Sequence, residues 1–170
     1  MNPPKKIEVF YDDREKYPVL FPEHVRYYTA DCKPKLVTVV ATRKRLDVGD
    51  YCLAAEPHGC VIERKGSVEE LAGNFFTADR RRAKSAFLSL VRTVRTPVLL
   101  LDFSLADFYR ETQNQPTPGL VVSEVLRLAR SLGLVVLSLG KCRGPNIRRN
   151  LGGFLIHYML EDMLHAQELQ

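Results

Sequence analysis

The chain has 170 residues, of which 45% are hydrophobic and 26% are charged, and its net charge is +5. This length and composition are typical of one globular domain that can bury a sizeable core. No stretch approaches the roughly 20 apolar residues that span a bilayer, and the N-terminus has no apolar run followed by a cleavage site. We therefore expect an intracellular protein, cytoplasmic or nuclear, and exclude a membrane-spanning or secreted one.

The periodicity of apolar residues predicts strands first, and then helices that alternate with strands. The predicted strands cover residues 7–13, 35–46, 47–55, 58–65, 98–103 and 134–140. A capping box, Ser67 with Glu70 three residues later, predicts a helix start, and further helices are predicted over residues 80–94, 121–133 and 146–164. Residues 116–120 are predicted to form a loop. This order favours an α/β domain with a mixed central sheet flanked by helices.

The last predicted helix has apolar residues over a wide arc. Beside its main stripe, a second row is formed by Ile156, Leu160 and Leu164. One core cannot easily cover so wide an arc, so this row predicts a partner surface and a dimer through the C-terminal helix.

Cysteines and histidines show no metal-site spacing. The four cysteines are Cys32, Cys52, Cys60 and Cys142, which we expect to be reduced, small core residues and not zinc ligands.

Basic residues gather in three segments, 43–45, 80–84 and 141–149. Three such segments in one small domain favour a nucleic-acid partner, although each alone is also typical of a solvated surface. The expected phosphate contacts are Arg80, Arg81, Arg82 and Lys84. Two aromatic pairs could stack on bases or lie in the core: Tyr27 with Tyr28, and Phe75 with Phe76.

Charges also gather where two predicted strands end. A turn around residues 57–58 places Asp50 opposite Lys65, with Glu63 on the adjacent diagonal, at Cβ separations of about 5 Å and about 7–8 Å. Two carboxylates offer hard oxygen ligands to Mg²⁺ or Mn²⁺, and a nearby ammonium can stabilise charge on a phosphate. The alternative is an exposed hairpin with an ordinary salt bridge, and the spacing alone leaves both open.

Gly49-Asp50, twelve residues, and then Glu63-Arg64-Lys65 resemble the signature of the XPF/Hef family of structure-specific DNA endonucleases. Asp12-Asp13-Arg14-Glu15 resembles the family's Asp-x-Arg-Glu element. Asp79-Arg80, the segment 95–103 and the final strand–loop–helix are also similar, so the resemblance covers most of the chain.

The resemblance implies a restriction-endonuclease-like core, metal-dependent cleavage of branched, flap or fork DNA in repair or recombination, and a homodimer or heterodimer of nuclease domains. It implies that Asp50, Glu63 and Asp12 are metal ligands and that Lys65 is the catalytic lysine. Arg64 is implied to support the site or approach a phosphate. Glu15 is implied to complete the acidic pocket, and Arg14 beside it is expected to contact DNA.

Two departures from the family pattern matter. The motif's final Asp is replaced by Glu69, and Glu70 follows it, so either residue can fill that position. The sequence also has no helicase and no tandem helix-hairpin-helix module, so we expect a single nuclease domain over residues 1–170.

Two other functions compete with this prediction. One is a non-catalytic DNA-binding or dimerisation subunit, against which the intact acidic motifs argue. The other is a restriction-type nuclease on the same core, which the sequence does not separate from a branch-specific enzyme.

Overall fold

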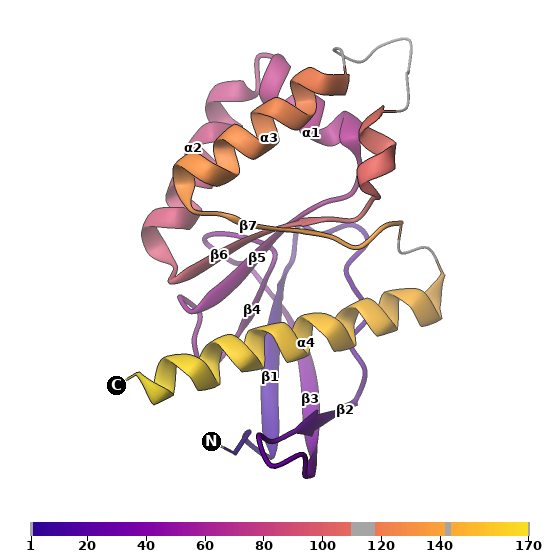
Figure 1. Cartoon of the computed structure of the whole chain (residues 1–170), viewed down its shortest axis with the longest axis vertical. Coiled ribbons are helices and arrows are strands. Elements are labelled where there is room, and N and C mark those ends of the chain that lie inside the picture. Colours follow the sequence, from indigo (N-terminus) through magenta and orange to yellow (C-terminus); the bar gives the residue numbers. More distant parts are fainter. Residues whose placement is uncertain (1, 110–117, 142–143, 170) are drawn as a thin grey trace. The chain divides into compact units, whose positions relative to one another are not determined.

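A computed structural model describes residues 2–109, 118–141 and 144–169 (Figure 1). The chain forms two units, named here the first unit (Met1–Val61 with Arg143–Gln170) and the second unit (Ile62–Cys142).

The first unit is built on four strands and one helix. The strands are β1 (Lys6–Asp12), β2 (His24–Tyr28), β3 (Pro34–Lys44) and β4 (Tyr51–Leu53), and the helix is α4 (Pro145–Glu168). Their order is β2-β3-β1-β4, with β1 parallel to β3 and the other two pairs antiparallel. The sheet is therefore mixed, as predicted.

Helix α4 lies across β1 and β3 in Figure 1. The Tyr27 ring on β2 stacks on His157 of α4, with 6.1 Å between the ring centroids. Gly152 allows the helix to approach residues 20–21, because an added Cβ at this position would lie 2.1 Å from the Leu20 carbonyl oxygen. Only glycine fits this contact.

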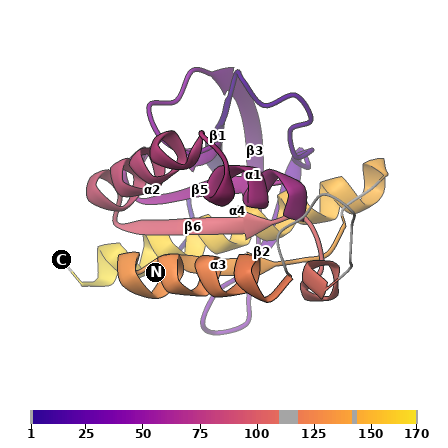
Figure 2. The same cartoon turned by 90° about the horizontal axis from the view of Figure 1, so that it is seen from above.

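The second unit contains most of β5 (Cys60–Lys65), then β6 (Thr96–Leu101) and β7 (Val135–Ser138). Its helices are α1 (Val68–Phe76), α2 (Arg80–Thr93), the short 3₁₀ helix η1 (Leu105–Tyr109) and α3 (Pro118–Leu132). Strand β6 is parallel to β7 and fully buried from Val98 to Leu101, as its unbroken apolar run predicts. Figure 1 shows α1, α2 and α3 on one side of these strands, and Figure 2 shows the same helices from above, with β6 visible between α2 and α3.

The predicted α/β class with a mixed sheet and flanking helices is confirmed. The sequence patterns did not predict β2 or η1, and they predicted a longer β4. The loop predicted over residues 116–120 was wrong over residues 118–120, which belong to α3, while residues 116–117 lie outside the described part of the chain. Strand β4 starts late because Gly49 has a positive φ of 69°, a left-handed conformation that interrupts the extended chain before Tyr51, and it ends at Leu53, whose carbonyl oxygen accepts from the Glu56 N–H in a turn.

The second apolar row of the last helix is not exposed, so that prediction was wrong. Ile156 and Leu160 have no exposed surface, and Leu164 is 5% exposed. The two apolar rows are neighbours, about 100° apart around the helix, so they form one wide apolar face that is largely buried. The larger exposed apolar residues of α4 are instead Ile147 and Phe154.

The cysteines divide between core and surface. Cys52 and Cys60 are buried, and burial raises the pKa of the Cys52 thiol to about 11. Cys32 is exposed, contrary to prediction, and Cys142 lies outside the described residues. In the described part of the chain, no helix has the length and apolar character to cross a membrane.

Candidate active site

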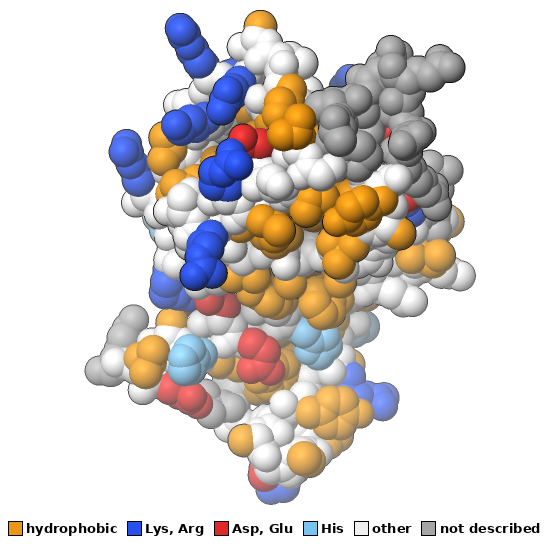
Figure 3. Space-filling model, turned by 45° about the horizontal axis from the view of Figure 1, so that its top comes forward, with side chains coloured by type: hydrophobic (Ala, Val, Ile, Leu, Met, Phe, Trp, Pro, Cys, Tyr) orange, Lys and Arg blue, Asp and Glu red, His pale blue; other side chains and the backbone are white. Residues whose placement is uncertain are grey.

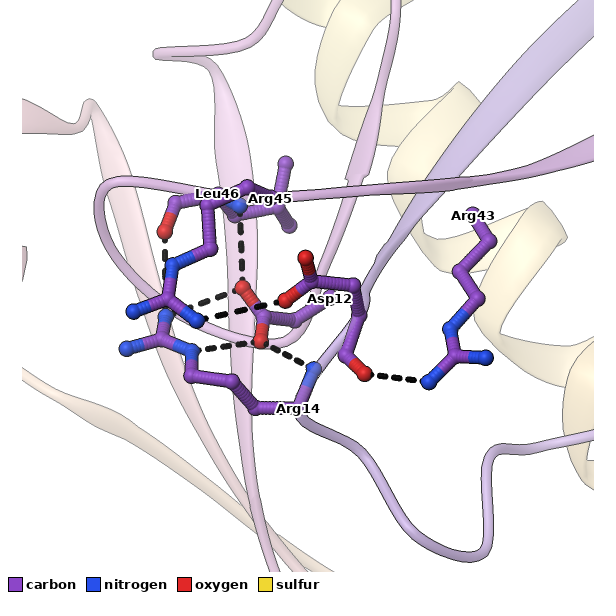
Figure 4. Close-up of polar contacts among 6 residues, drawn as sticks. Asp12, Arg14, Arg43, Arg45 and Leu46 are labelled. Carbon is purple, nitrogen blue, oxygen red and sulfur yellow. Dashed lines mark hydrogen bonds and ion pairs between the residues drawn. The ribbon is translucent and has the colours of Figure 1, made fainter.

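The segment Asp12 to Glu15, named here the acidic corner, follows β1 in the first unit (Figure 4). Asp12 has no exposed surface. Its Oδ1 accepts from Arg14 Nε at 2.6 Å and from the Arg14 backbone N–H at 2.8 Å. Its Oδ2 accepts from Arg14 Nη2 and from the Leu46 backbone N–H, both at 2.9 Å. Since a carboxylate offers about four lone-pair sites, these four bonds use the full capacity of Asp12.

The same bonds fix the charge of Asp12. Burial by itself raises the pKa of this carboxyl group, but the hydrogen bonds from Arg14 and Leu46 and the charge of Arg14 outweigh burial. The pKa of Asp12 is lowered to about 2. The hydrogen bond to Asp12 in turn raises the pKa of the Arg14 guanidinium, and the charge of Asp50 adds to this effect.

The other acids of the corner have their own partners. Asp13 accepts from Arg43 Nη2 through its carbonyl oxygen at 2.5 Å, and its carboxylate pairs with Arg45 at 3.3 Å. The Tyr51 hydroxyl donates to Glu15 Oε2 at 3.1 Å. Tyr51 is fully buried, so it holds Glu15 from inside the core.

Asp50 lies between Gly49 and β4 in the same unit and is half-buried. Its carbonyl oxygen accepts from the Asp12 backbone N–H at 2.8 Å, which ties the backbone of Asp50 to the end of β1. The acidic corner and the Gly-Asp motif, 38 positions apart, are therefore neighbours.

In the second unit, Lys65 is held between two carboxylates. Its Nζ lies 2.8 Å from Glu63 Oε1 and 3.3 Å from Glu70 Oε1. The side chains of Lys65 and Glu63 are 13% and 21% exposed, whereas that of Glu70 is 46% exposed. We refer to these three residues as the lysine cluster. Glu63 and Lys65 share a strand face because side chains alternate along β5.

The capping box shows how Glu70 reaches Lys65. Ser67 Oγ accepts from the Glu70 backbone N–H at 3.2 Å, and Glu70 Oε2 accepts from the Gly66 backbone N–H at 2.9 Å. This arrangement starts α1 and turns the Glu70 carboxylate back toward the end of β5. Of the two acids that the sequence left open, Glu70 contacts the lysine, while Glu69 is exposed in the first turn of α1.

Arg64 points away from the lysine cluster and pairs with Asp102. Its Nη2 lies 2.5 Å from Asp102 Oδ2, and the side chains are 14% and 9% exposed. The Asp102 backbone N–H also donates to the Lys65 carbonyl oxygen at 2.9 Å. Asp102 was not predicted as a site residue, although an acid directly after an all-apolar strand was a usable signal. The predicted role of Arg64 toward a phosphate stays a prediction.

Exposed cations begin α2, where Arg80, Arg81, Arg82 and Lys84 are all exposed. A cavity of about 200 Å³ lies beside them, lined by Phe75 of α1, Arg80 and Lys84 of α2, and Glu124, Arg127, Leu128 and Ser131 of α3. The contribution of Arg127 was not foreseen from the sequence. Figure 3 shows Lys and Arg side chains gathered on the upper face of the molecule.

The structure thus brings Asp12, Arg14, Glu15 and Asp50 together in the first unit, and Glu63, Lys65 and Glu70 in the second. The predicted pairing of Asp50 with Lys65 joins the two units and stays a prediction. Among the described residues, no group of three or more His, Cys, Asp or Glu side chains is arranged to hold a metal ion. The assignment of Asp12 as a metal ligand also stays a prediction, and binding would require Asp12 to give up one of its four hydrogen bonds.

No family model matches the chain, and no curated protein matches it in sequence. Among solved structures, XPF from Aeropyrum pernix is similar, with a TM-score of 0.59 and 14% identity over 91% of this chain and 60% of that chain. XPF from Aeropyrum pernix in complex with DNA gives the same TM-score and identity over 95% and 66% of the two chains. The chain therefore spans less than two thirds of the length of these structures. It has an XPF-like fold.

Proposed function

We propose that the protein is a metal-dependent endodeoxyribonuclease that acts on branched, flap or fork DNA in repair or recombination. The observation that carries this proposal is the lysine cluster, in which an ammonium lies between two carboxylates at the end of β5. The XPF-like fold, and the DNA complex known for a structure with that fold, support it.

The proposed ligands of a Mg²⁺ or Mn²⁺ ion are Asp50 and Glu63. Their carboxylate oxygens are the hard donors that these ions prefer, and Mg²⁺ commonly binds through only one or two carboxylates while keeping several waters. A donor set of fewer than three protein side chains therefore fits this ion. When bound, the metal would lower the pKa of a water and neutralise charge on a phosphate.

The protein's own residues would supply orientation and charge. Lys65 would stabilise negative charge on the reacting phosphate, because its ammonium is held by Glu63 and Glu70 and is only 13% exposed. The bonds of Asp12 to Arg14 and Leu46 would fix the corner whose backbone holds Asp50, and Asp12 would itself become a further metal ligand by releasing one of these bonds. Glu15, held by Tyr51, would add negative charge near the proposed ligands.

DNA binding would involve the basic residues of α2. Arg80 and Lys84, one helical turn apart, line a cavity that also receives Arg127 of α3. In the part of the chain that the structure describes, neither Arg80 nor Lys84 makes an ion pair with a carboxylate, so both are available for phosphate groups. A dimer through α4 would have to use its exposed apolar residues, Ile147 and Phe154.

The test is cleavage of labelled flap, fork and linear duplex DNA in the presence of Mg²⁺ or Mn²⁺. We expect Lys65→Ala and Asp50→Asn each to lower the cleavage rate by about 100-fold or more. Matched controls are Lys16→Ala and Asp47→Asn, which change exposed residues of the same types and should cleave normally.

Calorimetric titration with Mn²⁺ adds a readout that does not depend on activity. We expect binding that Asp50→Asn abolishes and Asp47→Asn preserves. Cleavage that persists in Lys65→Ala would overturn the site. A protein that binds DNA but neither cleaves it nor binds Mn²⁺ would instead be a non-catalytic subunit. Equal cleavage of linear and branched DNA would identify a restriction-type nuclease.

A further inference from the structure

The two faces of the first unit's sheet differ sharply in burial. Side chains that point toward α4 are almost fully buried: Ile7, Val9, Val25, Val37 and Val39 are all at most 7% exposed. The residues between them in the same strands point the other way and are largely exposed. We define the outer sheet face by eight of these side chains: Lys6, Glu8, Phe10, Arg26, Tyr28, Leu36, Val40 and Lys44.

Apolar and aromatic groups are exposed on the outer sheet face. Tyr28 is 56% exposed, Leu36 64% and Val40 37%. Tyr28 and Leu36 lie on paired strands, with Tyr28 opposite Pro34 and Leu36 opposite Arg26. Single exposed apolar residues need no explanation, but several on one continuous sheet surface indicate a binding function.

The two aromatic rings among these eight residues, Phe10 and Tyr28, differ in what covers them. The Lys44 ammonium lies 4.3 Å from the centroid of the Phe10 ring, so a cation already covers Phe10. Tyr28, in contrast to its buried neighbour Tyr27, is more than half exposed. Tyr28 is therefore the ring available for stacking with a ligand.

The charge of the outer sheet face is positive. Its cations are Lys6, Arg26 and Lys44, and Glu8 is its one acid among the eight defining residues. Glu8 Oε1 accepts a hydrogen bond from the Thr42 hydroxyl at 2.6 Å, so this acid already has a partner on the face.

This charge distinguishes between possible partners. In a two-fold dimer the same patch meets itself, so the three cations would face the cations of the second copy and repel them. A polyanion has the complementary charge. An exposed aromatic ring among cations, on an open sheet, is the arrangement that binds single-stranded nucleic acid by stacking and phosphate contact.

We propose that the outer sheet face is a non-catalytic binding surface for single-stranded nucleic acid, with Tyr28 stacking on a base and Arg26 and Lys6 contacting phosphates. The binding of a single strand does not depend on the proposed nuclease function. Only the identity of that strand, a single-stranded arm of the DNA substrate, rests on the proposed function.

The test is fluorescence anisotropy with a labelled oligothymidylate and with a labelled duplex, over a range of salt concentrations. We expect Tyr28→Ala to weaken binding of the single strand by about tenfold, and Tyr28→Phe to retain it, because stacking needs the ring and not the hydroxyl. Arg26→Ala should weaken binding and reduce the salt slope by about 0.7. Duplex binding should change less than twofold in Tyr28→Ala.

The matched controls are Tyr109→Ala, which changes a tyrosine of the second unit that is 67% exposed, and Lys16→Ala, which changes an exposed cation outside the strands. Both should bind the single strand as the unaltered protein does. Circular dichroism confirms that each variant is folded.

Three results would overturn the proposal: no binding of the single strand, unchanged affinity in Tyr28→Ala and Arg26→Ala, or a dimer by light scattering that Tyr28→Ala dissociates. The Lys65→Ala variant tests this proposal and the nuclease proposal separately. We expect that variant to lose cleavage and keep single-strand binding, and each readout tests only its own proposal.

Discussion

The acidic corner and the lysine cluster contain the same chemical groups, carboxylates beside a cation, but their carboxylates differ in burial and in hydrogen bonding. In the corner, Asp12 is fully buried and all its lone-pair sites accept hydrogen bonds. In the lysine cluster, Glu70 is 46% exposed and Lys65 is shared between two acids. The first arrangement stabilises the fold, whereas the second leaves a carboxylate within reach of a ligand.

The role of an acidic motif therefore has to be judged by the hydrogen-bond and ion-pair partners of each carboxylate oxygen atom. Both segments resemble parts of one nuclease signature, and from the sequence both are candidates for metal binding. Burial and hydrogen bonding separate them, because a saturated carboxylate must lose bonds before it can coordinate a metal.

The largest expected effect is the loss of the buried carboxylate. Asp12→Ala should lower the free energy of unfolding by about 3 kcal/mol, since it leaves the buried Leu46 N–H without an acceptor and removes the ion pair with Arg14. Glu63→Ala should cost about 1 kcal/mol or less, because Lys65 keeps Glu70 as a partner. Urea denaturation measures both, and equal losses would remove the contrast between the two regions.

The next largest effect is the pH dependence of stability. The pKa of Asp12 is lowered from 3.8 to about 2 in the folded protein, so its contribution is complete above pH 4 and is lost as pH falls through about 2. The contribution is at most about 2 kcal/mol, because Arg14 is half exposed and water screens its charge. Denaturation curves between pH 2 and 6 should show that the free energy of unfolding decreases as the pH falls. In Asp12→Asn this pH dependence should be weaker. An unchanged slope in Asp12→Asn would contradict it.

The smallest expected effect on stability is at Glu70. Glu70→Gln should cost less than about 1 kcal/mol, since its ion pair is exposed and a glutamine oxygen can still accept from the Gly66 N–H. Its effect on cleavage should nevertheless exceed that of Glu69→Gln, which is the matched control. If Glu69→Gln lowered cleavage more, Glu69 would fill the last acidic position of the motif.

Features that depend on nearby residues were predicted well. The capping box formed at Ser67 and Glu70, the apolar run before Asp102 became a buried strand, and α2 began at Arg80 as predicted. Strand β2 was missed although its residues alternate between exposed and buried positions, because only five residues carry this alternation.

Local sequence patterns were sufficient for the α/β class, the positions of most helices and strands, and the segments that carry acids and cations, because periodicity and capping act within a few residues. Which polar groups have hydrogen-bond partners follows from the tertiary fold. The bonds of Asp12 to Leu46 and of Arg64 to Asp102 join residues 34 and 38 positions apart, and the burial of Ile156 and Leu160 likewise follows from packing. Whether a carboxylate stabilises the fold or faces a ligand depends on such distant partners, and no local pattern contains them.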